Sequence, residues 1–89
     1  MLSDALRNTL VALQDQIQAQ AFLAKNPGTT CRALDDAQRR LAQHPKEHRE
    51  ILHAMRWAAP GITVANLDEP QLEALLAYQP PAPGLAIMA

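Results

Sequence analysis

Apolar residues in the first part of the chain recur with the period of an α-helix. Between Ser3 and Lys25 they are spaced three and four positions apart, which predicts an amphipathic helix with one apolar stripe. The stripe consists of Leu6, Leu10, Leu13, Ile17, Ala21 and Ala24. Ser3 is suited to cap the helix, and Asp4 lies at the positive end of the helix dipole. Asn26-Pro27-Gly28 ends it, because proline disfavours helical geometry in the residue before it and glycine permits a tight reversal.

The same period returns from about Thr30 to Gln43, with Thr29 or Thr30 as the cap. The apolar stripe of this second predicted helix is Cys31, Leu34, Ala37 and Leu41. Its other side carries two acid-before-base pairs at four-residue spacing, which is typical of a solvated helix face. The pairs are Asp35–Arg39 and Asp36–Arg40.

Pro45 interrupts the pattern and fits the first turn of a third helix, where its missing N–H costs nothing. This helix is predicted from Pro45 to Ala59, and Pro60-Gly61 ends it. The residues expected to be buried are Ile51, Leu52, Met55 and Ala58. A single helix that is kinked at Pro45 is the competing interpretation.

The last predicted helix has several start signals. Asp68 is the expected N-cap, and Gln71 stands at the spacing of a capping box. Leu67 and Leu72 occupy the two positions of a hydrophobic staple, and the helix continues to about Tyr78.

Two segments lack a helical pattern. Residues Ile62–Asn66 alternate in polarity, which predicts an extended segment, and the prolines at the start of 80–89 exclude a helix there. The sequence thus predicts an all-α fold. It is a small bundle of three to four helices in residues 1–79, with a short extended segment before the last helix. Residues 80–89 form a Pro-rich apolar tail that is either mobile or docked on the bundle.

Composition supports this fold class. The chain of 89 residues suits one domain, and it contains three glycines and only one Phe, one Trp and one Tyr. Ala, Leu, Gln, Arg and Glu, which favour helices, dominate instead.

Charge divides unevenly along the chain. Residues 1–56 hold eight basic and six acidic side chains, whereas 57–89 hold three acids, Asp68, Glu69 and Glu73, and no base. Neither part makes the strong basic field that a phosphate backbone requires, so nucleic acid is not an expected partner.

The expected cellular compartment follows from three features that the sequence does not show: a disulfide pair, a membrane span and an export signal. Its one cysteine, Cys31, has no partner for an internal disulfide, which favours a reducing environment. No apolar run approaches the roughly 20 residues of a bilayer crossing, and Met1–Asp4 do not resemble the start of an export signal. We expect a cytoplasmic protein with no membrane partner.

Histidine and cysteine are the first candidates for chemistry. His44 and His48 have a spacing that can serve a metal, but Pro45 lies between them, and His53 falls on another side of the helix. Cys31 lies on an apolar stripe, which predicts a buried, inert thiol. We therefore expect no metal and no cofactor.

Paired carboxylates are explained by helix chemistry. Asp35-Asp36 is matched by arginines, and Asp68-Glu69 begins a helix, where acids are favoured by the dipole. No phosphate loop, serine elbow or glycosidase-like arrangement is present. The sequence therefore predicts no catalytic residue and no enzyme activity.

Two aromatic residues lie off the apolar stripes. On a helical wheel Phe22 falls about 160° from the first stripe, close to Val11, and Trp57 falls about 120° from the third, beside Glu50 and His53. Either the bundle covers more than one face of these helices, or Phe22 and Trp57 belong to a partner-binding surface.

The order of three segments resembles a known family. They are Phe22–Gly28, which closes the long helix, the Gln- and Arg-rich helix Leu34–Gln43, and the apolar stretch with an acidic helix start and a Leu/Ala-rich end in Gly61–Tyr78. Together they resemble the small α-helical immunity proteins that neutralise a type VI secreted NAD(P)+ glycohydrolase toxin. The resemblance implies a cytoplasmic inhibitor that covers the active cleft of its cognate toxin and performs no catalysis. Asp68, Glu69 and Glu73 would then face a basic, dinucleotide-binding pocket.

Two other interpretations remain open. A secretion chaperone or an assembly adaptor that binds a partner protein is compatible with the same off-stripe aromatics. A DNA-binding regulator that uses the second and third helices is weaker, because the third helix mixes acids with its bases. These side chains are Lys46, Arg49 and Arg56 beside Glu47 and Glu50.

Overall fold

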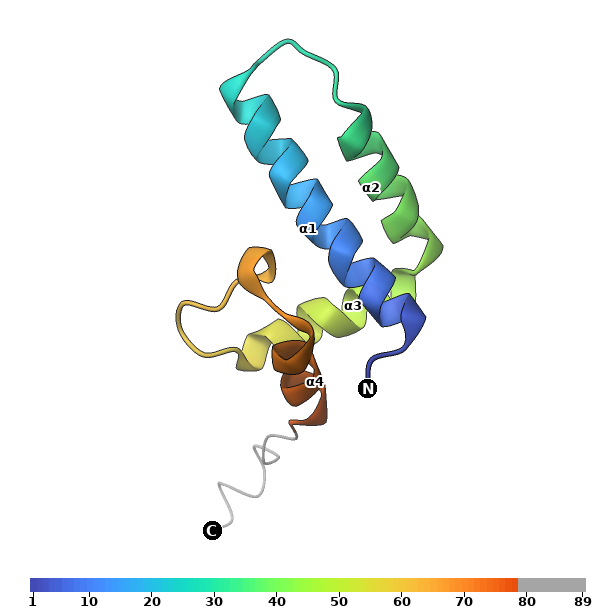
Figure 1. The fold of residues 1–89 in the computed structure, drawn as a ribbon, viewed down its shortest axis with the longest axis vertical. Helices are drawn as coiled ribbons and strands as arrows, with labels where there is room; N and C mark the ends of the chain where they lie inside the picture. Colours follow the sequence, from blue (N-terminus) through green and yellow to red (C-terminus); the bar gives the residue numbers. More distant parts are fainter. Residues whose placement is uncertain (79–89) are drawn as a thin grey trace, which may run out of the picture.

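The computed structural model describes residues 1–78, and in this part of the chain every regular element is helical. This confirms the predicted all-α class. Four α-helices and two short 3-10 helices follow one another along the chain (Figure 1). They are α1 (Asp4–Lys25), α2 (Arg32–Gln43), α3 (Pro45–Ala54), η1 (Met55–Trp57), η2 (Val64–Asn66) and α4 (Glu69–Ala77). The predicted tail, 80–89, lies outside the described residues.

The helices form two groups along α1. α1 and α2 lie side by side as a hairpin, and α3, η2 and α4 gather around the N-terminal half of α1 (Figure 1). The loop between α1 and α2 lies at the far end of the molecule from α4 (Figure 1). The C-terminal half of α1 therefore has α2 as its neighbour, whereas its N-terminal half is packed from several directions.

The hydrophobic core reflects this arrangement. Leu10 and Leu13 of α1 are buried as predicted, but Ile17, Ala21 and Ala24 of the same predicted stripe are exposed. The prediction fails there because only the N-terminal half of α1 is covered by the second group of helices. The other buried apolar residues of the core are Leu2, Ala12, Leu41, Ile51, Ala54, Leu67 and Leu72.

Local signals fix both ends of α1 as predicted. The hydroxyl oxygen of Ser3 accepts a hydrogen bond from the N–H of Leu6 at 3.2 Å. Asn26 is the C-cap, and Gly28 adopts a φ of +90°, which glycine tolerates and other residues rarely do.

The predicted cap of α2 is wrong. The helix begins at Arg32 with Cys31 at the N-cap position and no side-chain capping bond. Thr29 does not cap α2. Its hydroxyl donates a hydrogen bond to the carbonyl of Asn26 at 2.7 Å and so stabilises the loop after α1.

Pro45 starts a new helix instead of kinking a longer one. His44 separates α2 from α3 with φ −132° and ψ 59°, and Pro45 occupies the first turn of α3. α3 ends at Ala54, earlier than predicted, and continues as the tighter helix η1. Leu52 was expected to be buried but is 49% exposed, because α3 packs on the core through its opposite side, where Ile51 and Ala54 lie.

The segment before α4 is only partly extended. Thr63 is extended, but Val64–Asn66 form η2, so the prediction is wrong for these three residues. The Asn66 side chain causes the turn: its Oδ1 accepts from the N–H of Thr63 at 2.7 Å, and its Nδ2 donates to the carbonyl of Gly61 at 3.0 Å.

α4 starts as its sequence predicts. Asp68 accepts from the N–H of Gln71 at 2.8 Å, and the Gln71 side chain accepts from the N–H of Asp68 at 3.0 Å, which completes the capping box. Leu67 and Leu72, the two staple residues, are buried.

The side chain of Gln14 in α1 hydrogen-bonds to the segment that connects α3 and α4. Gln14 donates from Nε2 to the carbonyls of Val64, at 3.2 Å, and Leu67, at 2.8 Å. These contacts join residues that are 50 and 53 positions apart in sequence. They hold η2 against α1 and so determine where α4 begins.

Replacing Gln14 by alanine removes both hydrogen bonds and leaves two partly buried carbonyls without this partner. We expect the free energy of unfolding to fall by about 1–3 kcal/mol. Urea unfolding followed by far-UV circular dichroism measures the change. Gln20→Ala, at an exposed position of the same helix, is the matched control and should stay within about 0.5 kcal/mol of the wild type. Equal losses in the two variants would contradict this role of Gln14.

Candidate functional site: an aromatic groove

Trp57 lies at the centre of an aromatic cluster on the surface. Its ring centroid lies 5.8 Å from that of Tyr78, with the two rings tilted by 51°, and 6.3 Å from that of His53 in an edge-on arrangement. Trp57 is 39% exposed and Tyr78 52% exposed. The two largest aromatic side chains of the chain therefore present part of their rings to solvent together.

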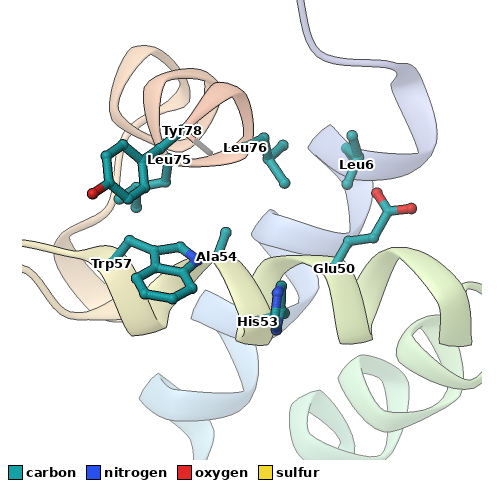
Figure 2. A pocket seen from close by; sticks show the side chains of 8 residues that line it. All are labelled: Leu6, Glu50, His53, Ala54, Trp57, Leu75, Leu76 and Tyr78. Atoms are coloured by element: carbon teal, nitrogen blue, oxygen red, sulfur yellow. The ribbon is translucent and has the colours of Figure 1, made fainter. Parts of the chain in front are cut away.

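These aromatics form one end of an open groove of about 590 Å³. Figure 2 shows Trp57 and Tyr78 at one end and Leu6 and Glu50 at the other. The residues that line the groove are Leu6, Glu50, His53, Ala54, Trp57, Leu75, Leu76 and Tyr78. The surface is largely apolar, and its one carboxylate stands at the edge.

One wall of the groove is a single helix face of α3 and η1. Glu50, His53 and Trp57 are three and four positions apart along α3 and η1, so they share one face, as the sequence predicted. α4 supplies the facing wall through Leu75 and Tyr78 (Figure 2). The groove is thus the seam between α3 and α4.

The polar atoms in the groove are free within the described residues. Neither the Trp57 indole nor the Tyr78 hydroxyl hydrogen-bonds to another residue of 1–78, and Glu50 makes no ion pair there. Tyr and Trp combine a large apolar surface with one polar atom, which suits a surface that is covered when a partner binds. The arrangement can recognise a partner, but it offers no nucleophile paired with a base.

Phe22, the other predicted aromatic contact, does not belong to this groove. It is 51% exposed and lies near the C-terminal end of α1, far from η1 (Figure 1). There it lines a separate groove of about 480 Å³ between α1 and α2. The structure therefore does not bring Phe22 and Trp57 together.

The three acids predicted to meet a partner are engaged within the chain. Asp68 caps α4, Glu69 Oε1 lies 2.7 Å from Nε of Arg7, and Glu73 pairs with the amino group of Met1 at 2.5 Å. The Arg7–Glu69 pair is close but not aligned as a hydrogen bond. None of the three acids lines the aromatic groove.

Sequence reasoning missed Tyr78 as a site residue. The sequence placed Tyr78 only at the end of the last predicted helix and assigned it no contact. A usable signal was its rarity, since the chain has one Tyr, one Trp and one Phe. Leu6 could not be found in this way, because only the packing of α1 beside α3 and α4 brings it to the groove.

The residues considered for chemistry lie apart. Cys31 is half-buried at the start of α2, less enclosed than predicted, and lines the groove that contains Phe22. His44 lies between α2 and α3, as the C-cap residue of α2 and the N-cap residue of α3. Within residues 1–78 no three His, Cys, Asp or Glu side chains form a group that could hold a metal ion. Among the helices of these residues, none combines the length and apolarity needed to cross a bilayer.

A comparison of this chain with protein-family models, curated proteins and solved structures finds no match.

The contributions of Asp68 and Glu69 to the free energy of unfolding can be measured by substitution. Asp68→Ala removes the side-chain acceptor of the capping box and should lower the free energy of unfolding by about 1 kcal/mol. Glu69→Gln breaks only a half-exposed ion pair and should cost less, between 0 and about 1 kcal/mol. Thermal and urea unfolding compare the two variants. A larger loss in Glu69→Gln than in Asp68→Ala would contradict this division of roles.

Proposed function

We propose that this chain binds another protein through the aromatic groove, as an immunity protein that covers the active cleft of a cognate secreted toxin. The observation that carries the proposal is the half-exposed Trp57–Tyr78 pair at the end of a largely apolar groove. Aromatic residues in such positions supply most of the binding free energy in many protein interfaces.

The shape and chemistry of the groove support a protein partner. A half-exposed tryptophan beside Tyr78 and Leu75 offers an apolar anchor, and Glu50 at the opposite edge offers a charge that no basic group of residues 1–78 neutralises. An apolar side chain flanked by a lysine or arginine on the partner would satisfy both ends. Binding of this kind needs no catalysis by the chain itself.

The toxin as partner is supported by the resemblance of three segments to immunity proteins, one of which, Gly61–Tyr78, supplies the α4 wall of the groove. A rigid helical scaffold is sufficient for an inhibitor, because affinity comes from complementary shape and charge. On this proposal the partner is an NAD(P)+ glycohydrolase domain, and the chain works inside the cell that makes both proteins.

A secretion chaperone or assembly adaptor is the second candidate. The groove lies open between α3 and α4, and such a groove can accept the apolar face of a partner helix. The identity of the bound protein distinguishes an immunity protein from a chaperone or adaptor. An immunity protein binds a toxic domain one-to-one and restores growth, whereas a chaperone binds a secreted subunit that is not toxic.

The first experiment is co-expression with the product of the gene directly upstream, followed by a pull-down and a growth assay. Trp57→Ala should weaken the complex by about 2 kcal/mol, roughly 30-fold in Kd, because it removes the main apolar anchor. Leu52→Ala is the matched control, since Leu52 is also about half exposed but lies outside the groove. Unchanged affinity in Trp57→Ala, or equal losses in the two variants, would exclude the aromatic groove as the binding surface.

The acidic helix α4 allows a test of electrostatic steering. Glu69→Gln with Glu73→Gln removes two negative charges and leaves the Asp68 cap intact. If the partner's cleft is basic, the association rate at low salt should fall severalfold, and added salt should reduce the difference. Stopped-flow mixing with the co-expressed partner measures it. An association rate that does not change at low salt would rule out steering by these acids.

A further inference from the structure

One face of the α1–α2 hairpin carries apolar side chains that nothing in residues 1–78 covers. Val11 is 44% exposed and Phe22 51% exposed. Each lies in a shallow groove between α1 and α2, and Arg40 lines both grooves, so the two grooves belong to one face of the hairpin. The aromatic groove shares no lining residue with this face.

The spacing of side chains along this face is symmetric. Val11, Asp15, Gln18 and Phe22 follow one another at steps of four, three and four, so they form a single stripe on α1. The two apolar residues stand at the ends, about 16 Å apart along the helix axis, and the two polar residues lie between them. Such a stripe reads the same in both directions in terms of apolar and polar positions.

This symmetry makes the stripe complementary to itself. If a second α1 lies antiparallel on the first, with a two-fold axis midway between Asp15 and Gln18, Val11 of each chain faces Phe22 of the other. In the same register Gln18 faces Asp15 of the other chain, and an amide can donate to a carboxylate. A two-fold interface requires that one patch fits itself in this way.

The charges on the face are compatible with a second copy. Asp15 already pairs with Nη2 of Arg40 at 2.7 Å, and both side chains are 42% exposed. Asp36, the other acid that lines the Phe22 groove, lies 3.8 Å from Nη1 of Arg39. Each acid of this face thus has a basic neighbour within its own chain, so two copies do not strongly repel one another. A strongly basic or acidic partner would gain little from it.

We infer that the chain associates with a second copy of itself through the Val11–Phe22 stripe of α1. Two α1–α2 hairpins then form an antiparallel four-helix arrangement, and the uncovered C-terminal half of α1 gains a neighbour on a second side. Only two Val–Phe contacts form across the two-fold axis, so we expect a weak dimer that forms at about micromolar concentration and above. Both aromatic grooves stay open in it, and the association does not depend on the proposed toxin partner.

Sedimentation of the purified full chain over a range of concentrations tests the association. The wild type should pass from the mass of one chain, 9.7 kDa, to twice that mass as the concentration rises. Phe22→Gln should weaken the dimer at least tenfold, because each interface loses two apolar contacts. Leu52→Gln, an equally exposed site on α3, should have no effect. A wild type that stays monomeric throughout, or a dimer that Phe22→Gln leaves unchanged, would overturn the inference.

A charge-exchange experiment tests the register. Val11→Lys alone and Phe22→Glu alone should each be monomeric, because each homodimer would bury a charge against an apolar side chain. Mixed together they should dimerise, since one Lys–Glu pair and one unchanged Val–Phe contact form in the mixed dimer. Circular dichroism first shows that both variants fold; if either does not, Val11→Gln and Phe22→Gln are compared by sedimentation. A folded mixture that stays monomeric would overturn the antiparallel pairing, as would glutamine variants that dimerise like the wild type.

Discussion

Burial of Leu10 and Leu13 of α1 is the interaction on which the other elements depend. The hydrophobic core gathers around these two side chains, with Ile51 of α3, Leu67 before α4 and Leu72 within it. A chain of 89 residues can bury only a limited share of its surface, so the molecule has one small core and cannot cover every helix face. Apolar groups beyond the reach of this core, such as Phe22 and Trp57, therefore remain available for contacts with other molecules.

Signals confined to a few neighbouring residues could be predicted from the sequence. The Ser3 cap, the start of α3 at Pro45 and the Asp68–Gln71 capping box are all present, because each depends on backbone chemistry within one helical turn. Features that depend on residues distant in sequence could not be predicted in this way. Leu52 and the C-terminal part of the α1 stripe are exposed because no helix of residues 1–78 packs on them. The Asn66 turn replaces an extended segment because the Asn66 side chain hydrogen-bonds to nearby backbone groups.

The candidate site was predictable in part for the same reason. Helical phasing placed Trp57 on the same face as Glu50 and His53 and away from the apolar stripe, and the structure confirms both features. Tyr78 reaches the groove from α4, and that position depends on Gln14 holding η2 against α1. Helical periodicity could not predict a contact made across about fifty residues of chain. The same limit applies to the acids of α4. The sequence shows the charges of Glu69 and Glu73, but it does not show that they pair with Arg7 and the Met1 amino group.

The separation of the two surfaces has a thermodynamic consequence. Binding at one site changes the affinity at another only if both ligands discriminate between the same two states of the protein, and a coupling free energy requires such states. The aromatic groove is built on the seam between α3 and α4, whereas the Val11–Phe22 stripe lies on the α1–α2 hairpin. Both rest on the same core around Leu10 and Leu13. A packed protein core does not adopt a second arrangement at small cost. Partner binding and self-association should therefore be independent, so that each chain of a dimer holds its own partner with the affinity of a single chain.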